Sequence, residues 1–318
     1  MIATGLAFAT TGLLLVLVPL AVIGPLNPTG GDVSAFLPAE QALIADVTTG
    51  DNRSNVFARY SLAGFAGAAI GSLAAGPVAK VGTSIGFETT NGAALAPLLY
   101  AAVGATVSLA YVRSSRGERT VQPVSQSRLN ESKSQVHRLA AVFALDSAGG
   151  GFVGTALIAA WLSRRFDFAL GQTGLVLALA AMASATSSLL APRLSRRFGL
   201  VETMVFTHIP ANVLCIAAGL APNASLAVTL LVLRALVSQL DVPARQTFVM
   251  SLVPAAERSA AAAFTNLPRS LAAASTPPIA GWLLYHSRFG WPLILGGSLK
   301  LLYDTLLFTL FRRQSIKA

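Results

Sequence analysis

Charge is scarce in this sequence of 318 residues: Asp, Glu, Lys and Arg make up 11% of the chain, and hydrophobic residues make up 54%. An ordinary soluble domain carries about 25% charged residues. Several apolar stretches reach the roughly 20 residues that a helix needs to cross a bilayer. The composition therefore excludes a typical soluble domain and predicts an all-α protein that crosses a membrane several times.

Cysteine and the usual cofactor motifs are nearly absent as well. The single cysteine, Cys215, excludes a disulfide framework and a cluster of thiolate metal ligands. The basic start of a signal peptide is missing, because no Lys or Arg precedes Arg53. Residues 149–154 match the glycine spacing of a dinucleotide site, but they lie in an apolar helix that no strand precedes. We therefore predict no catalytic centre, no metal site and no cofactor.

The positive charge that the chain does carry is unevenly distributed. The formal net charge is +10, and most of the 23 Lys and Arg residues fall on one side of the apolar segments, above all in 113–138 and 312–318. Cytoplasmic loops of membrane proteins show this excess. We therefore expect the segment 113–138 and the C-terminus in the cytoplasm of a protein of the plasma or inner membrane. The expected partners are anionic lipid and a small-molecule substrate, and not nucleic acid.

The segment 113–138 also divides the chain, because it is the least apolar stretch and is typical of a linker. We predict an incomplete first half over 1–112 and a second half over 139–318, with about nine or ten membrane-spanning helices in all. The predicted helices cover 1–10, 13–46 (interrupted at 25–31), 56–78, 93–112, 139–162, 171–191, 201–220, 225–248, 259–284 and 291–311.

The sequence contains an internal repeat. A shift of 205 positions aligns residues 38–76 with residues 243–281 without a gap. A repeat in the same direction is the sequence mark of a transporter built from two parallel halves. The identical pairs are Pro38/Pro243, Ala39/Ala244, Gln41/Gln246, Arg53/Arg258, Ser54/Ser259, Leu62/Leu267, Ala68/Ala273, Ala69/Ala274, Ala75/Ala280 and Gly76/Gly281.

Three segments carry a family resemblance. RLSRRFG (193–199), FLPAEQALIAD (36–46) and LDSAGGGFVG (145–154) are similar to segments of the major facilitator superfamily of secondary transporters. The resemblance implies a bundle of two parallel six-helix repeats, of which this chain carries the end of helix three to helix twelve. It also implies that the chain is N-terminally truncated, because the first two helices of the family have no counterpart.

The same resemblance implies a function. It is that of a secondary active transporter that moves a small molecule by alternating access, with efflux as the candidate direction and protons as the candidate coupling ion. The alternative is a truncated membrane protein that does not transport, or a subunit that depends on a partner. The residues implied to form a cytoplasmic gating loop are Arg193, Arg196, Arg197 and Gly199.

Ionisable side chains within apolar helices are functional candidates, because burying them in a bilayer is costly unless they are paired or face water. Arg234, Ser238, Asp241 and Arg245 have the spacing of one face of a continuous helix. Asp241 is placed to neutralise an arginine. Two interpretations remain open, a role in transport and an Asp–Arg network that holds helix ends together.

The next two helices contain further candidates. Asn266 and Arg269 flank Pro268, which frees a backbone carbonyl from the helical hydrogen bonds. Lys300 and Asp304 are four residues apart, so we predict that they neutralise each other on one face of the last helix. That pair is either structural or involved in binding substrate or protons.

Asp146 is the main candidate for a proton carrier. It precedes three glycines (149–151), and a carboxylate removed from water at such a place favours the protonated form. Glu40 is a comparable candidate in the first half, with Gln41 as a neutral hydrogen-bonding partner. His208 is interpreted as a packing residue rather than a ligand.

Overall fold

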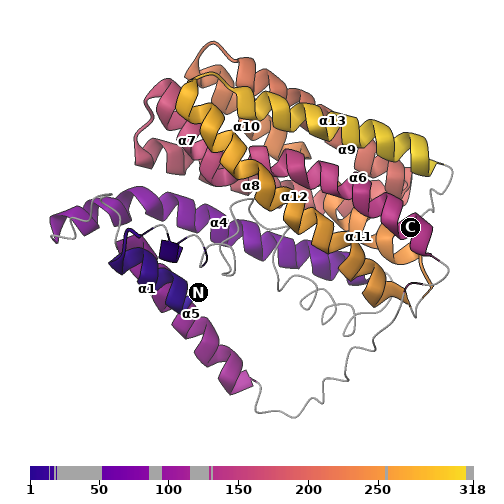
Figure 1. The fold of residues 1–318 in the computed structure, drawn as a ribbon, viewed down its shortest axis with the longest axis horizontal. Coiled ribbons are helices and arrows are strands. Elements are labelled where there is room, and N and C mark those ends of the chain that lie inside the picture. Colours follow the sequence, from indigo (N-terminus) through magenta and orange to yellow (C-terminus); the bar gives the residue numbers. More distant parts are fainter. Residues whose placement is uncertain are drawn as a thin grey trace. The chain divides into compact units, whose positions relative to one another are not determined.

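The computed structural model describes residues 1–13, 15–17, 19, 52–85, 95–114, 129, 132–254 and 257–312. Every regular element of this part is a helix, as the composition predicts, and no strand occurs in it. The helices of Figure 1 are α1 (Ile2–Thr10), α4 (Asn52–Ser84), α5 (Leu95–Ser114), α6 (Lys133–Phe152), α7 (Thr155–Phe166), α8 (Leu170–Phe198), α9 (Leu200–Leu220), α10 (Ala224–Val237), α11 (Asp241–Ser251), α12 (Arg258–His286) and α13 (Trp291–Phe311).

The chain forms two compact units. The first comprises residues 1–27 and 73–125, and the second comprises residues 28–72 and 126–318. The limits predicted from the polar segment 113–138, namely 1–112, 113–138 and 139–318, differ from these compact units and stay a prediction. The second unit contains α6 to α13 and carries the candidate site.

In the first unit, α1 packs against α5 at two glycines. A Cβ atom at Gly5 would lie 2.6 Å from the carbonyl oxygen of Pro97, and one at Gly104 would lie 2.7 Å from the Cβ of Met1. The two helix backbones therefore touch, which is how helices associate in lipid.

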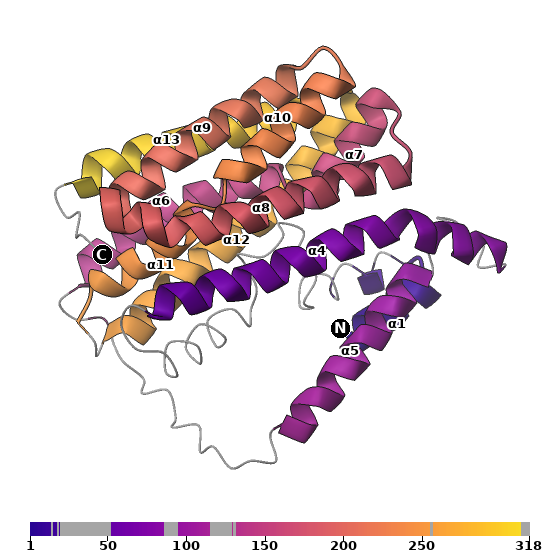
Figure 2. The same ribbon diagram turned by 180° about the vertical axis from the view of Figure 1, so that it is seen from behind.

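In the second unit, α6 packs along both α12 and α13, and α9 packs along α13 and α10. Figures 1 and 2 show these helices side by side from opposite directions, with α8 against α10. A short loop joins α9 to α10, whereas α9 and α13 are distant in the sequence and meet only through packing.

Two apolar clusters fill the second unit. The tryptophan cluster lies where α7, α9, α10 and α13 meet, and the tyrosine cluster lies where α6, α9, α11 and α13 meet. The tryptophan cluster includes Phe152, Trp161, Leu162, Cys215, Leu231 and Leu293. The tyrosine cluster includes Leu139, Phe143, Met204, Phe248, Tyr303 and Leu307.

Buried charged residues lie between the two clusters. Along α6 the chain runs from Phe143 in the tyrosine cluster to Phe152 in the tryptophan cluster, and Asp146 lies between them. His208 on α9 and Lys300 on α13 occupy the same intermediate level of their helices. The apolar layers on either side place these polar groups at mid-depth in the bundle.

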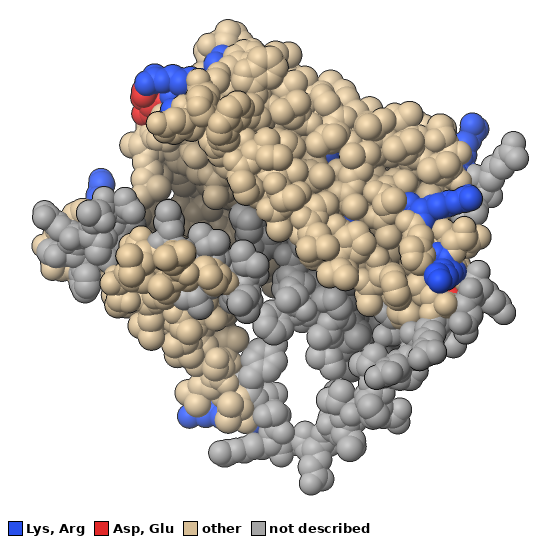
Figure 3. Space-filling view, in the orientation of Figure 1, with Lys and Arg blue, Asp and Glu red and all other residues tan. Residues whose placement is uncertain are grey.

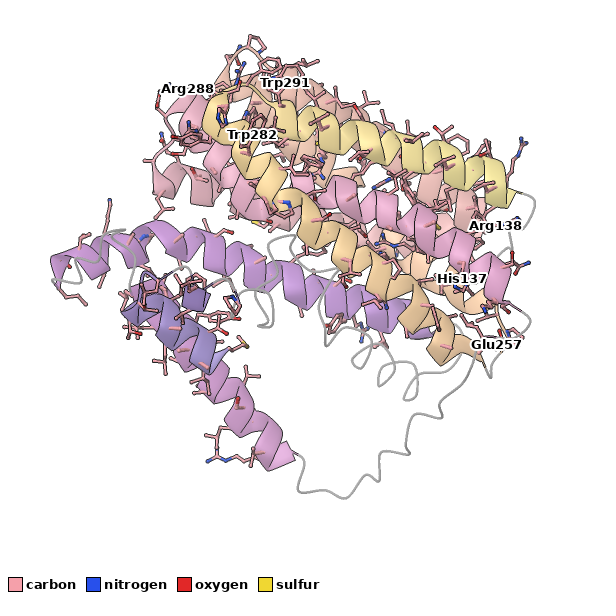
Figure 4. All side chains as sticks on the ribbon, in the orientation of Figure 1. His137, Arg138, Glu257, Trp282, Arg288 and Trp291 are labelled. Atoms are coloured by element: carbon pink, nitrogen blue, oxygen red, sulfur yellow. The ribbon has the colours of Figure 1, made fainter. Side chains whose placement is uncertain are left out.

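The surface of the second unit has the features of a membrane protein. Figure 3 shows a broad face without charged side chains and Lys and Arg gathered at its ends. Trp282 and Trp291 lie at one end together with Arg288, and His137 lies at the other (Figure 4). Both tryptophans are exposed. Such aromatic side chains favour the membrane–water interface.

Five helices of the described part are long and apolar enough to cross a membrane by length and composition. Two shorter apolar helices, Leu95–Ala110 and Ala224–Val237, accompany them. The five are Arg59–Ser84, Lys133–Phe166, Leu170–Leu190, Leu200–Leu220 and Trp291–Phe311. Most of the predicted helix at 13–46 lies outside the described residues.

The predicted helix at 139–162 is two helices. α6 ends at Phe152 and α7 begins at Thr155, so Val153 and Gly154 interrupt the helix. The three glycines at the end of α6 explain the break, because glycine is a poor helix former in the middle of a segment.

The predicted helix at 225–248 is also two helices rather than one. α10 ends at Val237, and α11 begins at Asp241. Pro243 lacks the backbone N–H that a continuous helix would pair with the carbonyl of Gln239, so the segment between them leaves the helical path. The single face predicted for this segment therefore does not exist as such.

The predicted gating loop is mostly helical. Residues 193–198 form the last turns of α8, and only Gly199 separates α8 from α9. Gly199 has a φ of 95°, a value that residues with a side chain rarely adopt. The basic residues are thus held on a helix end, and their gating role stays a prediction.

The helix positions agree with the internal repeat. α4 begins at Asn52 and α12 at Arg258, within one residue of positions related by the shift. The first helix of the earlier copy, around residues 38–46, lies outside the described part. The predicted helices 56–78 and 259–284 begin four residues and one residue later than α4 and α12, respectively.

Close contact between α6 and α13 yields a stability prediction. A Cβ atom at Gly296 would lie 2.8 Å from both the carbonyl oxygen of Gly149 and the Cγ1 of Val153. Gly296→Val is expected to destabilise the protein by about 1–3 kcal/mol, because the packed backbones have no room for the side chain. Gly281→Val is the control, since nothing lies within 4 Å of a Cβ there. Equal unfolding midpoints in detergent would contradict the α6–α13 packing.

Candidate functional site

Asp146 is the centre of a buried ionic cluster. Its Oδ1 accepts a hydrogen bond from Lys300 Nζ at 2.6 Å, and its Oδ2 accepts one from Arg245 Nη1 at 3.0 Å. His208 Nε2 lies 3.7 Å from Oδ1. Asp146 is only 4% exposed, so one buried carboxylate from α6 is paired with two cations, one from α11 and one from α13.

A second carboxylate, Asp304, lies behind His208. Asp304 is fully buried at 0% exposure, and its Oδ1 lies 2.8 Å from His208 Nδ1. Asn212 Nδ2 donates to its Oδ2 at 2.9 Å. An ionised carboxylate only accepts hydrogen bonds, so with Asp304 ionised, Nδ1 of His208 is the donor in this contact. The imidazole thus bridges Asp304 and Asp146.

The predicted ion pair between Lys300 and Asp304 is therefore wrong. Each residue finds its partner on another helix, Lys300 on α6 and Asp304 on α9. His208 is buried with its polar contacts made to other side chains, in agreement with its interpretation as a packing residue, although the two carboxylates near it were not predicted. Its polar contacts come from helices that are distant in sequence, and the i, i+4 spacing of His208 and Asn212 was the one local signal for them.

Arg269 joins α12 to α6. Its Nε donates to Ser147 Oγ at 3.2 Å, and its Nη1 donates to Asn266 Oδ1 at 3.2 Å. The guanidinium also lies 6.0 Å from the ring centroid of Phe143. Thr276 adds a hydrogen bond from its Oγ1 to the carbonyl of residue 148 at 2.9 Å. The structure thus places the predicted pair Asn266 and Arg269 in contact.

A cavity of about 560 Å³ opens beside the ionic cluster within the second unit. One side of α4, from Tyr60 to Ser72, contributes to its lining. The four residues predicted to share a helix face all line it, although the helix is broken between them: Arg234, Ser238, Asp241 and Arg245. The other ionisable residues of its described lining are Asp146, His208, Arg269 and Lys300.

The remaining predicted residues have mixed outcomes. Glu40 and Gln41 lie outside the described residues. Arg193 and Arg197 are exposed at the end of α8, and the Arg196 side chain belongs to the part that is not described. The functional role of every predicted site residue stays a prediction. Among the described residues, no group of three or more His, Cys, Asp or Glu side chains is arranged to hold a metal ion.

Fold and cavity together define a class, a bundle of apolar helices around a charged cavity at mid-depth. The family model described as Major Facilitator Superfamily matches residues 139–317, more than half of the chain. The chain therefore belongs to the major facilitator superfamily, as the sequence resemblance predicted. It is a multi-pass membrane protein, and its family is one of transporters rather than enzymes.

Two relatives extend the comparison. The chain is 23% identical to "Uncharacterized membrane protein YJR124C" of Saccharomyces cerevisiae, over 98% of this chain and 77% of the yeast protein. It also resembles the crystal structure of a bacterial homologue of the iron transporter ferroportin in an outward-facing state. That match has a TM-score of 0.54 and 16% identity, and it covers 97% of this chain and 79% of the other. At this identity the likeness concerns the fold alone.

Proposed function

We propose that this protein is a secondary active transporter that carries a small molecule across the plasma or inner membrane by alternating access. The observation that carries the proposal is the cavity beside the Asp146 cluster, bounded by side chains from α4 and from α6 to α13. A water-accessible cavity at mid-depth is where transporters of this architecture bind their substrates.

The ionic cluster supports the proposal because its members come from separate helices. Asp146 on α6 holds Arg245 on α11 and Lys300 on α13 through hydrogen bonds that can be exchanged. The breaks at 153–154 and 238–240 lie on two of the helices that line the cavity. Export and a coupling proton on Asp146 are not needed for this proposal and stay predictions.

The orientation of the protein follows the distribution of its charge. In this proposal the end of the second unit that carries His137 and Arg138 faces the cytoplasm, with the basic linker, and the end that carries Arg288 faces away (Figure 4). The positive-inside rule supports this assignment.

Alternating access predicts that one cavity position can be reached from both sides of the membrane. In a Cys215→Ala background, Ser238→Cys places a thiol on the cavity lining. We expect a membrane-impermeant maleimide to label it in right-side-out and in inverted vesicles. Leu233→Cys on the exposed surface of α10 is the control, since a thiol that faces lipid is not ionised and reacts from neither side.

The labelling result also distinguishes the alternative function. A protein that does not transport, or that serves only as a partner-dependent subunit, keeps its cavity open to one side at most. Labelling of Ser238→Cys from a single side under every condition would therefore contradict the proposed function and favour that alternative.

A further inference from the structure

The described lining of the cavity carries more positive than negative charge. Its cations are Arg234, Arg245, Arg269 and Lys300, and its carboxylates are Asp146 and Asp241. Counting the buried Asp304 behind His208 as a third carboxylate still leaves an excess of cations. An excess of buried positive charge at mid-depth in a membrane is costly unless an anion offsets it.

Arg234 is the cation of this lining that has no carboxylate partner among the described residues. It lies in the last turn of α10, and its Nε is buried without a hydrogen-bond partner. Lys300 and Arg245 are held by Asp146, whereas no carboxylate of the described residues forms an ion pair with Arg234. The thiol of Cys215 lies beside the guanidinium, but it is a neutral group and does not offset the charge. A buried guanidinium Nε–H without a hydrogen-bond acceptor is available to an acceptor from outside the chain.

The neighbouring groups suit an anion as well. Arg269 donates to Ser147 Oγ and to Asn266 Oδ1, and its guanidinium is a further cation of the same lining. A guanidinium group matches the two oxygens of a carboxylate or a related oxyanion, with two parallel hydrogen bonds. The chemistry of the lining therefore favours an anionic group over a cationic one.

The rest of the lining indicates what the anionic group is attached to. Apolar side chains such as Ile158, Val176 and Leu231 border the cavity on the side of the tryptophan cluster. A volume of about 560 Å³ lies within the range of sites for drug-sized molecules. The cavity therefore has room for a ligand with one charged group and one apolar group.

We propose that the cavity binds an organic anion whose oxyanion head is held by Arg234 and whose apolar body lies against α7, α8 and α10. This inference rests on the proposed function for the movement of the anion, but not for its binding. It names the class of substrate, a small amphiphilic oxyanion, which the family alone leaves undefined.

The binding experiment uses three probes with one apolar body and three charges: 4-phenylbutanoate, the neutral 4-phenylbutanamide and the cationic 4-phenylbutylamine. Binding to the full chain in lipid nanodiscs is measured by calorimetry. We expect saturable binding of the anion and at least about tenfold weaker binding of the other two, since an unpaired charge-assisted hydrogen bond accounts for a factor of this size.

Variants test the role of Arg234. Arg234→Gln is expected to weaken binding of 4-phenylbutanoate at least about tenfold, and Arg234→Lys is expected to lie between it and the wild type, because the charge remains and the planar fork is lost. Arg164→Gln, an exposed arginine at the end of α7, should bind like the wild type. Arg234→Gln should unfold no earlier than the wild type, since it removes a half-buried charge that no carboxylate of the described residues pairs with. A folded Arg234→Gln protein with unchanged affinity for the anion would overturn the inference.

Flux of the same probes into proteoliposomes separates this inference from the proposed function. Saturable binding of the anion without flux would contradict the transporter proposal and leave the anion site intact. Flux of the amine in preference to the anion would leave transport intact and overturn the anion site. Absence of saturable anion binding by the wild-type protein would also overturn it.

Discussion

Replacing Asp146 with asparagine is expected to destabilise the protein by about 3–5 kcal/mol, the loss that follows when one partner of a buried ion pair is removed. The carboxylate accepts hydrogen bonds from Lys300 Nζ and Arg245 Nη1, and it is buried. Asparagine keeps the shape but not the charge, so two cations would remain in an apolar interior. Reversible unfolding in mixed micelles of rising SDS content measures the change.

Asp167→Asn is the matched control for this variant. Asp167 is exposed at the end of α7 with a φ of 54°, a conformation that asparagine adopts readily, so its stability should stay within about 0.5 kcal/mol of the wild type. An Asp146→Asn protein as stable as this control would contradict the central role of the carboxylate.

A double variant tests whether the loss comes from unpaired charge. Lys300→Met in the Asp146→Asn background removes the cation that loses its hydrogen-bonded carboxylate, whereas Arg245 keeps Asp241, whose Oδ2 lies 3.9 Å away. We expect the double variant to be more stable than Asp146→Asn alone, with a coupling of at least about 0.5 kcal/mol. Strictly additive losses would show that the two residues act independently.

The sequence predicted the long helices, the family and many residues of the cavity lining. Hydropathy fixes where helices of membrane length lie, and the costliness of ionisable groups in lipid drew attention to Asp146, Arg234, Arg269 and Lys300 before their partners were known. The four residues from Arg234 to Arg245 line the same cavity although the helix between them is broken. The residue types alone were therefore sufficient to predict that these four side chains belong together, without knowledge of the break in the backbone.

The partners of these groups could not be predicted from the sequence. Membrane helices are apolar on all sides, so periodicity does not show which face of α13 meets α6. Local spacing paired Lys300 with Asp304, whereas glycines at 149 and 296 bring α6 against α13 and put Lys300 on Asp146 instead. The role of His208 depends on the same packing, because its two carboxylate neighbours lie on α6 and α13.

Exchanging the carboxylate of Asp304 with the amide of Asn212 tests the second half of the buried network. Asp304 accepts hydrogen bonds from His208 Nδ1 at 2.8 Å and from Asn212 Nδ2 at 2.9 Å. Asp304→Asn turns one acceptor into a donor that faces another donor, and we expect a loss of about 1–3 kcal/mol, the cost of a buried polar group left unsatisfied. Asn212→Asp places two carboxylates against each other, and this repulsion should also destabilise the protein.

The double variant Asn212→Asp/Asp304→Asn is expected to be more stable than either single variant. It restores one amide and one carboxylate at opposite positions, and the new carboxylate lies within reach of His208 Nδ1, because Asn212 Nδ2 is 3.1 Å from that atom in the native protein. The SDS unfolding midpoints of all three variants are compared with that of Thr305→Ala, an exposed change one residue further along α13. A double variant less stable than both single variants would show that the network depends on the native orientation of its groups, with the carboxylate on α13 and the amide on α9, and not merely on having one of each.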